Sequence, residues 1–241
     1  MPSIPKVVRL AAMADIHYSK SSQGSLQPLL AQVAENADVL VLCGDLTDYG
    51  LPEEAHVLAE EIRSFATIPV LGVLGNHDYE SGQTAEVTRI LCEAGVTMLD
   101  GECCEIGGVG FAGVCGFGGG FGRRMLNAWG EPLIKQFVQE SISHAIRLEQ
   151  ALVKLQTERR IAILHYSPIR ATLEGEDPEI YAFLGSSRLE EPINRFRATA
   201  VFHGHAHNGI TDGKTSTGIP VYNVSAPVLH KTGKPYRIVE L

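Results

Sequence analysis

The alternation of hydrophobic and polar stretches is most regular in the first part of the chain, up to about residue 95. Short runs that are almost wholly apolar are typical of strands buried on both faces, and apolar residues at every third or fourth position are typical of amphipathic helices. The pattern predicts strands at 7–14, 38–43 and 69–75 and helices at 26–37, 51–66 and 84–95. Strands that alternate with helices through short connections require crossover helices, so we expect an α/β fold with a largely parallel sheet.

The remaining chain has shorter apolar runs that are separated by glycines. These runs predict short strands within 96–116, a long helix from about 133 to 156, a strand at 160–168, a helix at 186–197 and a strand at 198–204, with strand-like sequence from there to residue 241. Neither an internal repeat nor a long linker interrupts the pattern. We therefore predict a single domain over residues 1–241, a common size for one α/β domain.

One segment has a biased composition, "GFGGGFGRR" at 116–124. It contains neither a Gly-x-x-x-x-Gly-Lys phosphate loop nor a Gly-x-Gly-x-x-Gly motif in register, so a dinucleotide site is not predicted. The glycines indicate a loop. Two interpretations stay open at this stage: a flexible surface loop, or a flap over an active site from which Arg123 or Arg124 reaches a substrate phosphate.

Composition narrows the functional classes. The chain of 241 residues has 28 acidic and 20 basic side chains, a formal net charge of −8, which disfavours an extended nucleic-acid-binding surface. Its five cysteines include no Cys-x-x-Cys motif, which is typical of reduced thiols. The amino-terminal segment lacks a clear apolar signal core, and no apolar run approaches the length of a membrane span. We expect a cytoplasmic protein with no membrane partner.

Polar motifs follow the predicted strands at the point where each strand ends. They read "DIH", "GDLTD", "GNHD", "LHYSP" and "GHAH", in chain order. The residues in them that could bind a ligand or react are Asp15, His17, Asp45, Asp48, Asn76, His77, Asp78, His165, His205 and His207. Ligands of open α/β sheets bind at the carboxyl ends of the strands, so we expect these side chains to meet at one sheet edge.

Each of these motifs alone is also typical of a plain polar turn, because Gly, Asn and Asp tolerate turn backbone. Burying several carboxylates and imidazoles at one edge would be costly without a cation to compensate them. The set as a whole therefore predicts a metal site.

The stretch "VFHGHAHNG" (201–209) contains three alternating histidines. His203, His205 and His207 would share one face if the strand continued through them, because alternate residues of a strand point the same way. Gly204 instead indicates a bulge or a turn. From these residues alone, a polar turn and a metal-binding segment are equal alternatives.

The ordered series Asp-x-His, Gly-Asp-x-x-Asp, Gly-Asn-His-Asp, His and Gly-His-x-His resembles the calcineurin-like metallophosphoesterases. The resemblance extends from Asp15 to His207, most of the chain. It implies a four-layer α/β/β/α sandwich with two mixed β-sheets and a binuclear metal centre. One metal ion would be held by Asp15, His17, Asp45 and His207. The other would be held by Asp45, Asn76, His165 and His205, with Asp45 bridging the two ions.

The resemblance also assigns roles around the ligands. His77 would be the catalytic residue that contacts the phosphate, and Asp78 would orient the His77 ring through its other nitrogen. His203 falls outside the motif and is expected to be a supporting or plain turn histidine.

The implied activity is hydrolysis of a phosphomonoester or phosphodiester through a hydroxide that bridges two divalent ions. Oxygen and nitrogen ligands suit manganese, iron or zinc better than calcium. A cyclic-nucleotide phosphodiesterase and a nuclease of the same family are alternatives, and a scaffold of the same fold without catalysis is a third. Tyr49 and Asp78 stand where serine/threonine protein phosphatases have arginine and glutamate, which disfavours that branch. We expect a small phosphoester substrate, and the oligomeric state stays open.

Overall fold

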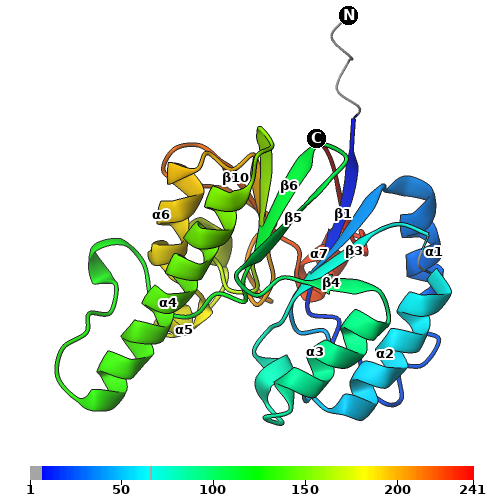
Figure 1. The fold of residues 1–241 in the computed structure, drawn as a ribbon. Coiled ribbons are helices and arrows are strands. Elements are labelled where there is room, and N and C mark those ends of the chain that lie inside the picture. The colour runs from blue at the N-terminus through cyan, green and yellow to red at the C-terminus, as the bar shows by residue number, and fades with distance from the viewer. Residues whose placement is uncertain (1–6, 66) are drawn as a thin grey trace, which may run out of the picture.

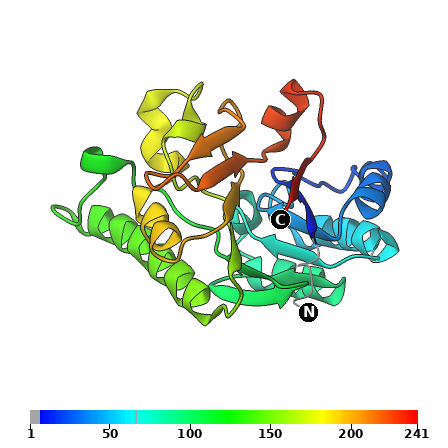
Figure 2. The same ribbon diagram turned by 90° about the horizontal axis from the view of Figure 1, so that it is seen from above.

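The computed structural model of the protein describes residues 7–65 and 67–241, and its centre consists of two β-sheets packed face to face (Figure 1). The first sheet has the strand order β11-β1-β2-β3-β4. Its strands are β1 (Arg9–Met13), β2 (Val39–Cys43), β3 (Val70–Val73), β4 (Val96–Met98) and β11 (Arg237–Glu240). The four amino-terminal strands are parallel, and β11 pairs with β1 in the antiparallel sense. Figure 2 shows β11, in dark red, beside β1, in dark blue.

The second sheet has the order β5-β6-β7-β8-β10-β9 and is also mixed. Its strands are β5 (Glu102–Ile106), β6 (Val109–Gly113), β7 (Arg159–Ile163), β8 (Ala200–His203), β9 (Asp212–Lys214) and β10 (Pro220–Asn223). The central pairs are parallel, whereas the edge strands β5 and β9 are antiparallel to their neighbours.

Helices cover the outer face of each sheet (Figure 1). The first sheet carries α1 (Gln27–Asn36), α2 (Pro52–Phe65) and α3 (Thr84–Glu93), and the second carries α4 (Pro132–Lys154) and α6 (Ser187–Arg195). Two short helices, α5 (Tyr181–Leu184) and α7 (Ala226–Lys231), lie in the connections. The expected four-layer sandwich with two mixed sheets is confirmed. Within the part of the chain that is described, no helix combines the length and apolarity needed to cross a membrane.

Burial on both faces explains why the strand sequences are almost continuously apolar. Along β1, Leu10 and Ala12 face the second sheet, while Ala11 and Met13 face the helices. The layer between the sheets includes Phe111 and other wholly buried apolar side chains. Successive residues of a strand point to opposite faces, so a strand in a middle layer needs apolar residues at every position.

The prediction that the chain is strand-like from 204 to 241 is wrong for residues 226–231, which form α7. Pro227 stands in the first turn, where its missing N–H costs no hydrogen bond, and Val228 and Leu229 are buried. The predicted strand at 160–168 also ends early, at Ile163, and a loop carries the residues that follow it. One residue of the helix predicted at 51–66, Ala66, lies outside the described residues.

Candidate metal centre

The polar motifs converge from both sheets, not from one sheet edge. Asp15, Asp45 and Asn76 follow β1, β2 and β3 of the first sheet, while His165 and the segment with His205 follow β7 and β8 of the second. The backbone N–H of His205 donates to both carboxylate oxygens of Asp15, at 3.1 and 3.0 Å. The carboxyl ends of the parallel strands in the two sheets therefore form a common rim.

The backbone of this rim is strained. Among the described residues, the non-glycine residues with positive φ are Asp15 (56°), His17 (42°), Asp45 (49°), Arg197 (49°) and His205 (68°). Four of these five belong to the predicted ligand set. Such conformations cost about 1–3 kcal/mol each and are concentrated at functional sites, where the surrounding structure maintains them.

Two glycines make the close packing of the rim sterically feasible. A Cβ atom on Gly75 would collide with the carboxylate of Asp45, and one on Gly204 would collide with the carboxylate of Asp15. Each glycine directly precedes a predicted ligand in the sequence, so the "GN" and "GH" motifs have a steric as well as a turn-forming basis.

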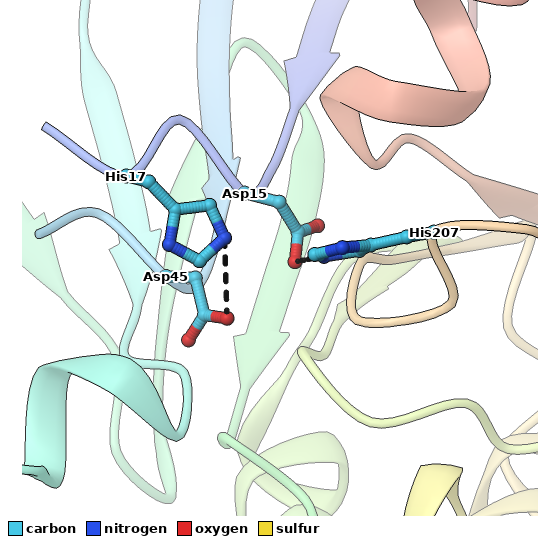
Figure 3. Close-up of side chains that lie close together, drawn as sticks. All are labelled: Asp15, His17, Asp45 and His207. Atoms are coloured by element: carbon cyan, nitrogen blue, oxygen red, sulfur yellow. Dashed lines mark hydrogen bonds and ion pairs between the residues drawn. The ribbon is translucent and has the colours of Figure 1, made fainter. Parts of the chain in front are cut away.

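The first cluster consists of Asp15, His17, Asp45 and His207, whose potential ligand atoms lie within 4.8 Å of one another (Figure 3). The Nε2 atom of His207 is 2.8 Å from Oδ1 of Asp15, and Nε2 of His17 is 3.8 Å from Oδ2 of Asp45. The Nδ1 atom of His17 is buried and has no hydrogen-bond partner among the described residues. A buried nitrogen without a partner is rare in proteins and is typical of a site that takes a further ligand.

The second cluster contains Asp45, His165 and His205, again within 4.8 Å. The Nδ1 atom of His165 lies 2.9 Å from the carbonyl of Cys43, and its Nε2 lies 2.9 Å from Oδ1 of Asn76. A carbonyl can only accept, so Nδ1 carries the proton and Nε2 presents a lone pair. Two acceptors that face each other at 2.9 Å repel unless a proton or a cation lies between them.

The pKa values of Asp15 and His205 leave atoms of both side chains available to bind a cation. Burial raises the pKa of Asp15, but the hydrogen bond from His207 and the neighbouring imidazoles outweigh burial and leave that pKa below its usual value. The same hydrogen bond raises the pKa of His207. Burial lowers the pKa of His205 to about 3, so this ring is neutral and has a free lone pair at physiological pH.

His77 lies beside the first cluster, with its ring centroid 4.5 Å from that of His17. The expectation that Asp78 orients the His77 ring is wrong, because Nδ1 of His77 bonds the backbone carbonyl of Asp48 at 2.7 Å. The carboxylate of Asp78 is fully buried and accepts from the backbone N–H groups of Leu46, Thr47 and Gly75 and from the Thr47 hydroxyl. Asp78 therefore fixes the loop that carries Asp45 and does not contact the catalytic candidate.

His203 is separate from the clusters, in agreement with its place outside the motif. Its Nε2 lies 2.8 Å from the Thr172 hydroxyl and its Nδ1 lies 2.8 Å from the carbonyl of Gly204. Burial lowers its pKa to about 4. Asp48 was a candidate from its motif, but the resemblance gave it no role. Its carboxylate lies 3.7 Å from Nδ1 of His17, and it forms a third group with His17 and His77. The "GDLTD" motif was the available signal for it.

The glycine-rich segment is not a free surface loop over its first half. Residues 116 and 118–120 are buried, and the N–H groups of Gly119 and Gly120 donate to the carbonyls of Ala182 and Gly185 at 2.7 and 2.9 Å. Arg123 and Arg124 are exposed. The flap with a phosphate-contacting arginine stays a prediction.

Two groups of aspartate and histidine that share Asp45 could hold two metal ions, an arrangement that metal-dependent phosphatases and related hydrolases use. The model of the calcineurin-like phosphoesterase family matches residues 8–209, so the chain belongs to this family and is a hydrolase that acts on phosphoester bonds. No curated protein matches the chain significantly.

Solved structures with similar folds support the architecture. The protein TT1561 of Thermus thermophilus superposes with a TM-score of 0.53 and 17% identity, covering 98% of this chain and 99% of that one. A putative 5′-nucleotidase from Staphylococcus aureus in complex with alpha-ketoglutarate gives a TM-score of 0.56 and 16% identity over 90% of this chain. The present chain covers 48% of that protein. At these identities the likeness concerns the fold alone.

Proposed function

We propose that the protein hydrolyses a small phosphomonoester or phosphodiester with two divalent cations, manganese, iron or zinc. One cation is held by Asp15, His17, Asp45 and His207, and the other by Asp45, Asn76, His165 and His205. The observation that carries the proposal is the pair of clusters with Asp45 in common, each with ligand atoms within 4.8 Å.

The donor atoms fit such cations. The set combines carboxylate and amide oxygens with imidazole nitrogens, a mixture that suits these metals. The buried Nδ1 of His17 lacks a hydrogen-bond partner among the described residues, and the lone pairs of His165 and Asn76 face each other. The second feature is unfavourable in the protein alone, and a cation bound by Nε2 of His165 and Oδ1 of Asn76 would relieve it.

Bound cations supply Lewis acidity, which lowers the pKa of water and neutralises charge on the phosphoryl oxygens. The side chains of the protein position the cations and supply a proton to the leaving group. Asp45 lies between the two groups, with its Oδ1 held at 2.9 Å by the backbone N–H of His77. Because the Asp48 carbonyl accepts the Nδ1 proton of His77, the proton that this ring can donate to the leaving oxygen is the second one, carried on Nε2 of the imidazolium form.

The test is hydrolysis of a nitrophenyl phosphate ester by purified protein with added manganese, iron or zinc. Asp45→Ala should abolish the activity, because it removes a ligand from both clusters. Glu60→Ala, which removes an exposed carboxylate from α2, is the matched control and should leave the rate unchanged. Activity that survives Asp45→Ala would reject the assignment.

The substrate is resolved by a panel of phosphomonoesters, cyclic nucleotides, nucleotide diesters and single-stranded DNA. The resemblance of fold to a putative 5′-nucleotidase is the reason to include nucleoside monophosphates. Metal analysis separates the enzyme from a scaffold, since a scaffold would retain well under one metal ion per chain after loading.

A further inference from the structure

A cavity of about 370 Å³ opens directly beside the second cluster, and its wall includes Asn76 and His205. Apart from the Tyr166 hydroxyl, the other side chains of the wall are apolar, and the rings of Phe117, Phe137, Tyr166 and Phe183 dominate it. Among the described residues that line it, none carries a charged side chain apart from the titratable His205. Binding pockets are typically apolar concavities with a few polar groups at one end, and the polar end here is the proposed metal centre.

The aromatic rings form a continuous path from the metal centre outward. Tyr166 lies 4.4 Å from His205 between ring centroids, and Phe117 lies 5.8 Å from Tyr166. Phe137 follows at 4.8 Å from Phe117, and Phe183 lies edge-on to Phe137 at 6.0 Å. Phe183 is 60% exposed. An exposed ring at the outer end of such a path leaves an aromatic surface available to a ligand.

The glycine-rich segment holds this wall in place. Phe117 belongs to it, and the N–H of Gly119 donates to the carbonyl of Ala182 on α5, the helix that carries Phe183. A Cβ on Gly118 would lie 2.6 Å from the same carbonyl and 3.1 Å from the ring of Phe137. Close contact between the segment, α4 and α5 therefore depends on glycine, and the pocket is formed before any ligand enters.

We propose that this pocket binds the esterified group of the substrate and that this group is uncharged and carries an aromatic ring. The inference rests on the proposed function, because it places the phosphoryl group at the metal centre. A sugar or glycerol would find few hydrogen-bond partners among the rings and would lose its hydration, whereas a flat apolar ring can stack on them. The pocket thus selects the alcohol part of the ester.

The first test compares esters whose alcohols have similar basicity, so that leaving-group chemistry does not decide the result. We expect kcat/KM for 2-phenylethyl phosphate to exceed that for propyl phosphate by at least about 10-fold, from burial of the ring. The corresponding methyl diesters extend the comparison to diesterase activity. Equal values of kcat/KM within each pair would overturn the proposal, as would equal values for 2-cyclohexylethyl and 2-phenylethyl phosphate.

Substitutions in the pocket test whether its rings cause the preference for an aromatic ester. Phe183→Ala removes a largely exposed ring, so it should leave the fold intact and lower the ratio of kcat/KM for 2-phenylethyl phosphate to that for propyl phosphate about 5-fold or more. Val153→Ala, at an exposed apolar position near the other end of α4, is the control and should change neither ester. A preference untouched by Phe183→Ala and by Phe137→Leu would overturn the assignment of the pocket.

A binding measurement separates this inference from the proposed function. Calorimetric titration of the manganese-loaded protein with 2-phenylethylphosphonate and propylphosphonate needs no hydrolysis. Tighter binding of the phenyl compound, lost in Phe183→Ala, supports the pocket even if every ester is stable in the presence of the protein. Hydrolysis of esters without any difference between the two phosphonates supports the function and rejects the pocket.

Discussion

The buried carboxylate of Asp78 offers a direct test of how the metal centre is supported. Its Oδ2 accepts from the N–H groups of Leu46 and Gly75 at 3.1 and 2.8 Å, and its Oδ1 accepts from the N–H and hydroxyl of Thr47 at 2.8 and 2.6 Å. Burial raises the pKa of Asp78, while these hydrogen bonds oppose it. Three backbone N–H groups and one hydroxyl donate to this carboxylate, and such donors favour its charged form.

Asp78→Asn keeps the volume but turns one acceptor into an NH₂ donor. In the less costly orientation the amide nitrogen faces Thr47. The Thr47 hydroxyl can rotate and accept from this nitrogen, but the Thr47 backbone N–H loses its hydrogen-bond acceptor. An unsatisfied buried N–H costs about 1–3 kcal/mol, and the remaining bonds lose their charge assistance, for a total of about 3 kcal/mol. For a chain of this length, that corresponds to a fall in Tm of about 6–12 °C.

The same change should weaken metal binding, because Leu46 and Thr47 directly follow Asp45. Supporting residues around metal ligands typically contribute about 10–100-fold in affinity. Thermal denaturation of the metal-free protein and calorimetric titration with manganese measure the two effects. His77→Ala is the comparison, and it should lower Tm little and leave metal affinity unchanged. A Tm of Asp78→Asn within about 2 °C of the parent would refute this role, since a loss of about 3 kcal/mol exceeds that shift.

Further predictions follow from the geometry of the rim. His77→Ala should reduce turnover about 10²–10⁴-fold, less for nitrophenyl esters than for alkyl esters, because nitrophenolate needs no proton to leave; equal losses would exclude proton donation. Gly204→Ala should push the Asp15 carboxylate aside and lower the metal content per chain, as measured by elemental analysis. The pKa of His207 is raised, so a cation that binds this ring must displace its proton. Calorimetry in buffers of different ionisation enthalpy should detect the released proton, and the affinity for manganese should increase with pH through the His207 titration. Burial lowers the pKa of His203 to about 4, so the unfolded chain takes up a proton at this residue before the folded protein does. The free energy of unfolding of the metal-free protein should therefore fall by about 3 kcal/mol between about pH 6.5 and pH 4, and His203→Gln should flatten this part of the pH–stability curve.

The sequence predicted the fold best where burial is two-sided. Runs such as "DVLVLC" must lie in a middle layer, since every position of β2 is buried. Helix α7 was missed because it has only six residues, with Val228 and Leu229 buried, and so short a segment cannot establish a helical period. Pairing of β11 with β1 joins the two ends of the described chain, and a local pattern contains no information about such a partner.

The candidate site was predictable as a set of residues but not as a network. Position at strand ends predicted that the candidates of one sheet lie together, because parallel strands place their carboxyl ends side by side, but it did not predict that the rims of the two sheets meet. Hydrogen-bond partners were not predictable in this way. The Asp48 carbonyl that holds His77 and the Cys43 carbonyl that holds His165 are backbone atoms, and any residue type could supply them. The aromatic pocket draws its rings from four separate segments, with no common motif.

The glycines that precede three of the candidate ligands connect the sequence motifs with the contacts between them. Gly44 precedes Asp45, Gly75 precedes Asn76 and Gly204 precedes His205. A Cβ on Gly44 would strike the ring of His165, one on Gly75 the carboxylate of Asp45, and one on Gly204 the carboxylate of Asp15. Each glycine thus makes room for a proposed ligand that follows a different strand. The left-handed backbone at Asp15, Asp45 and His205 is then stabilised by contacts between neighbouring motifs, so strain in one loop is compensated by the close approach of another.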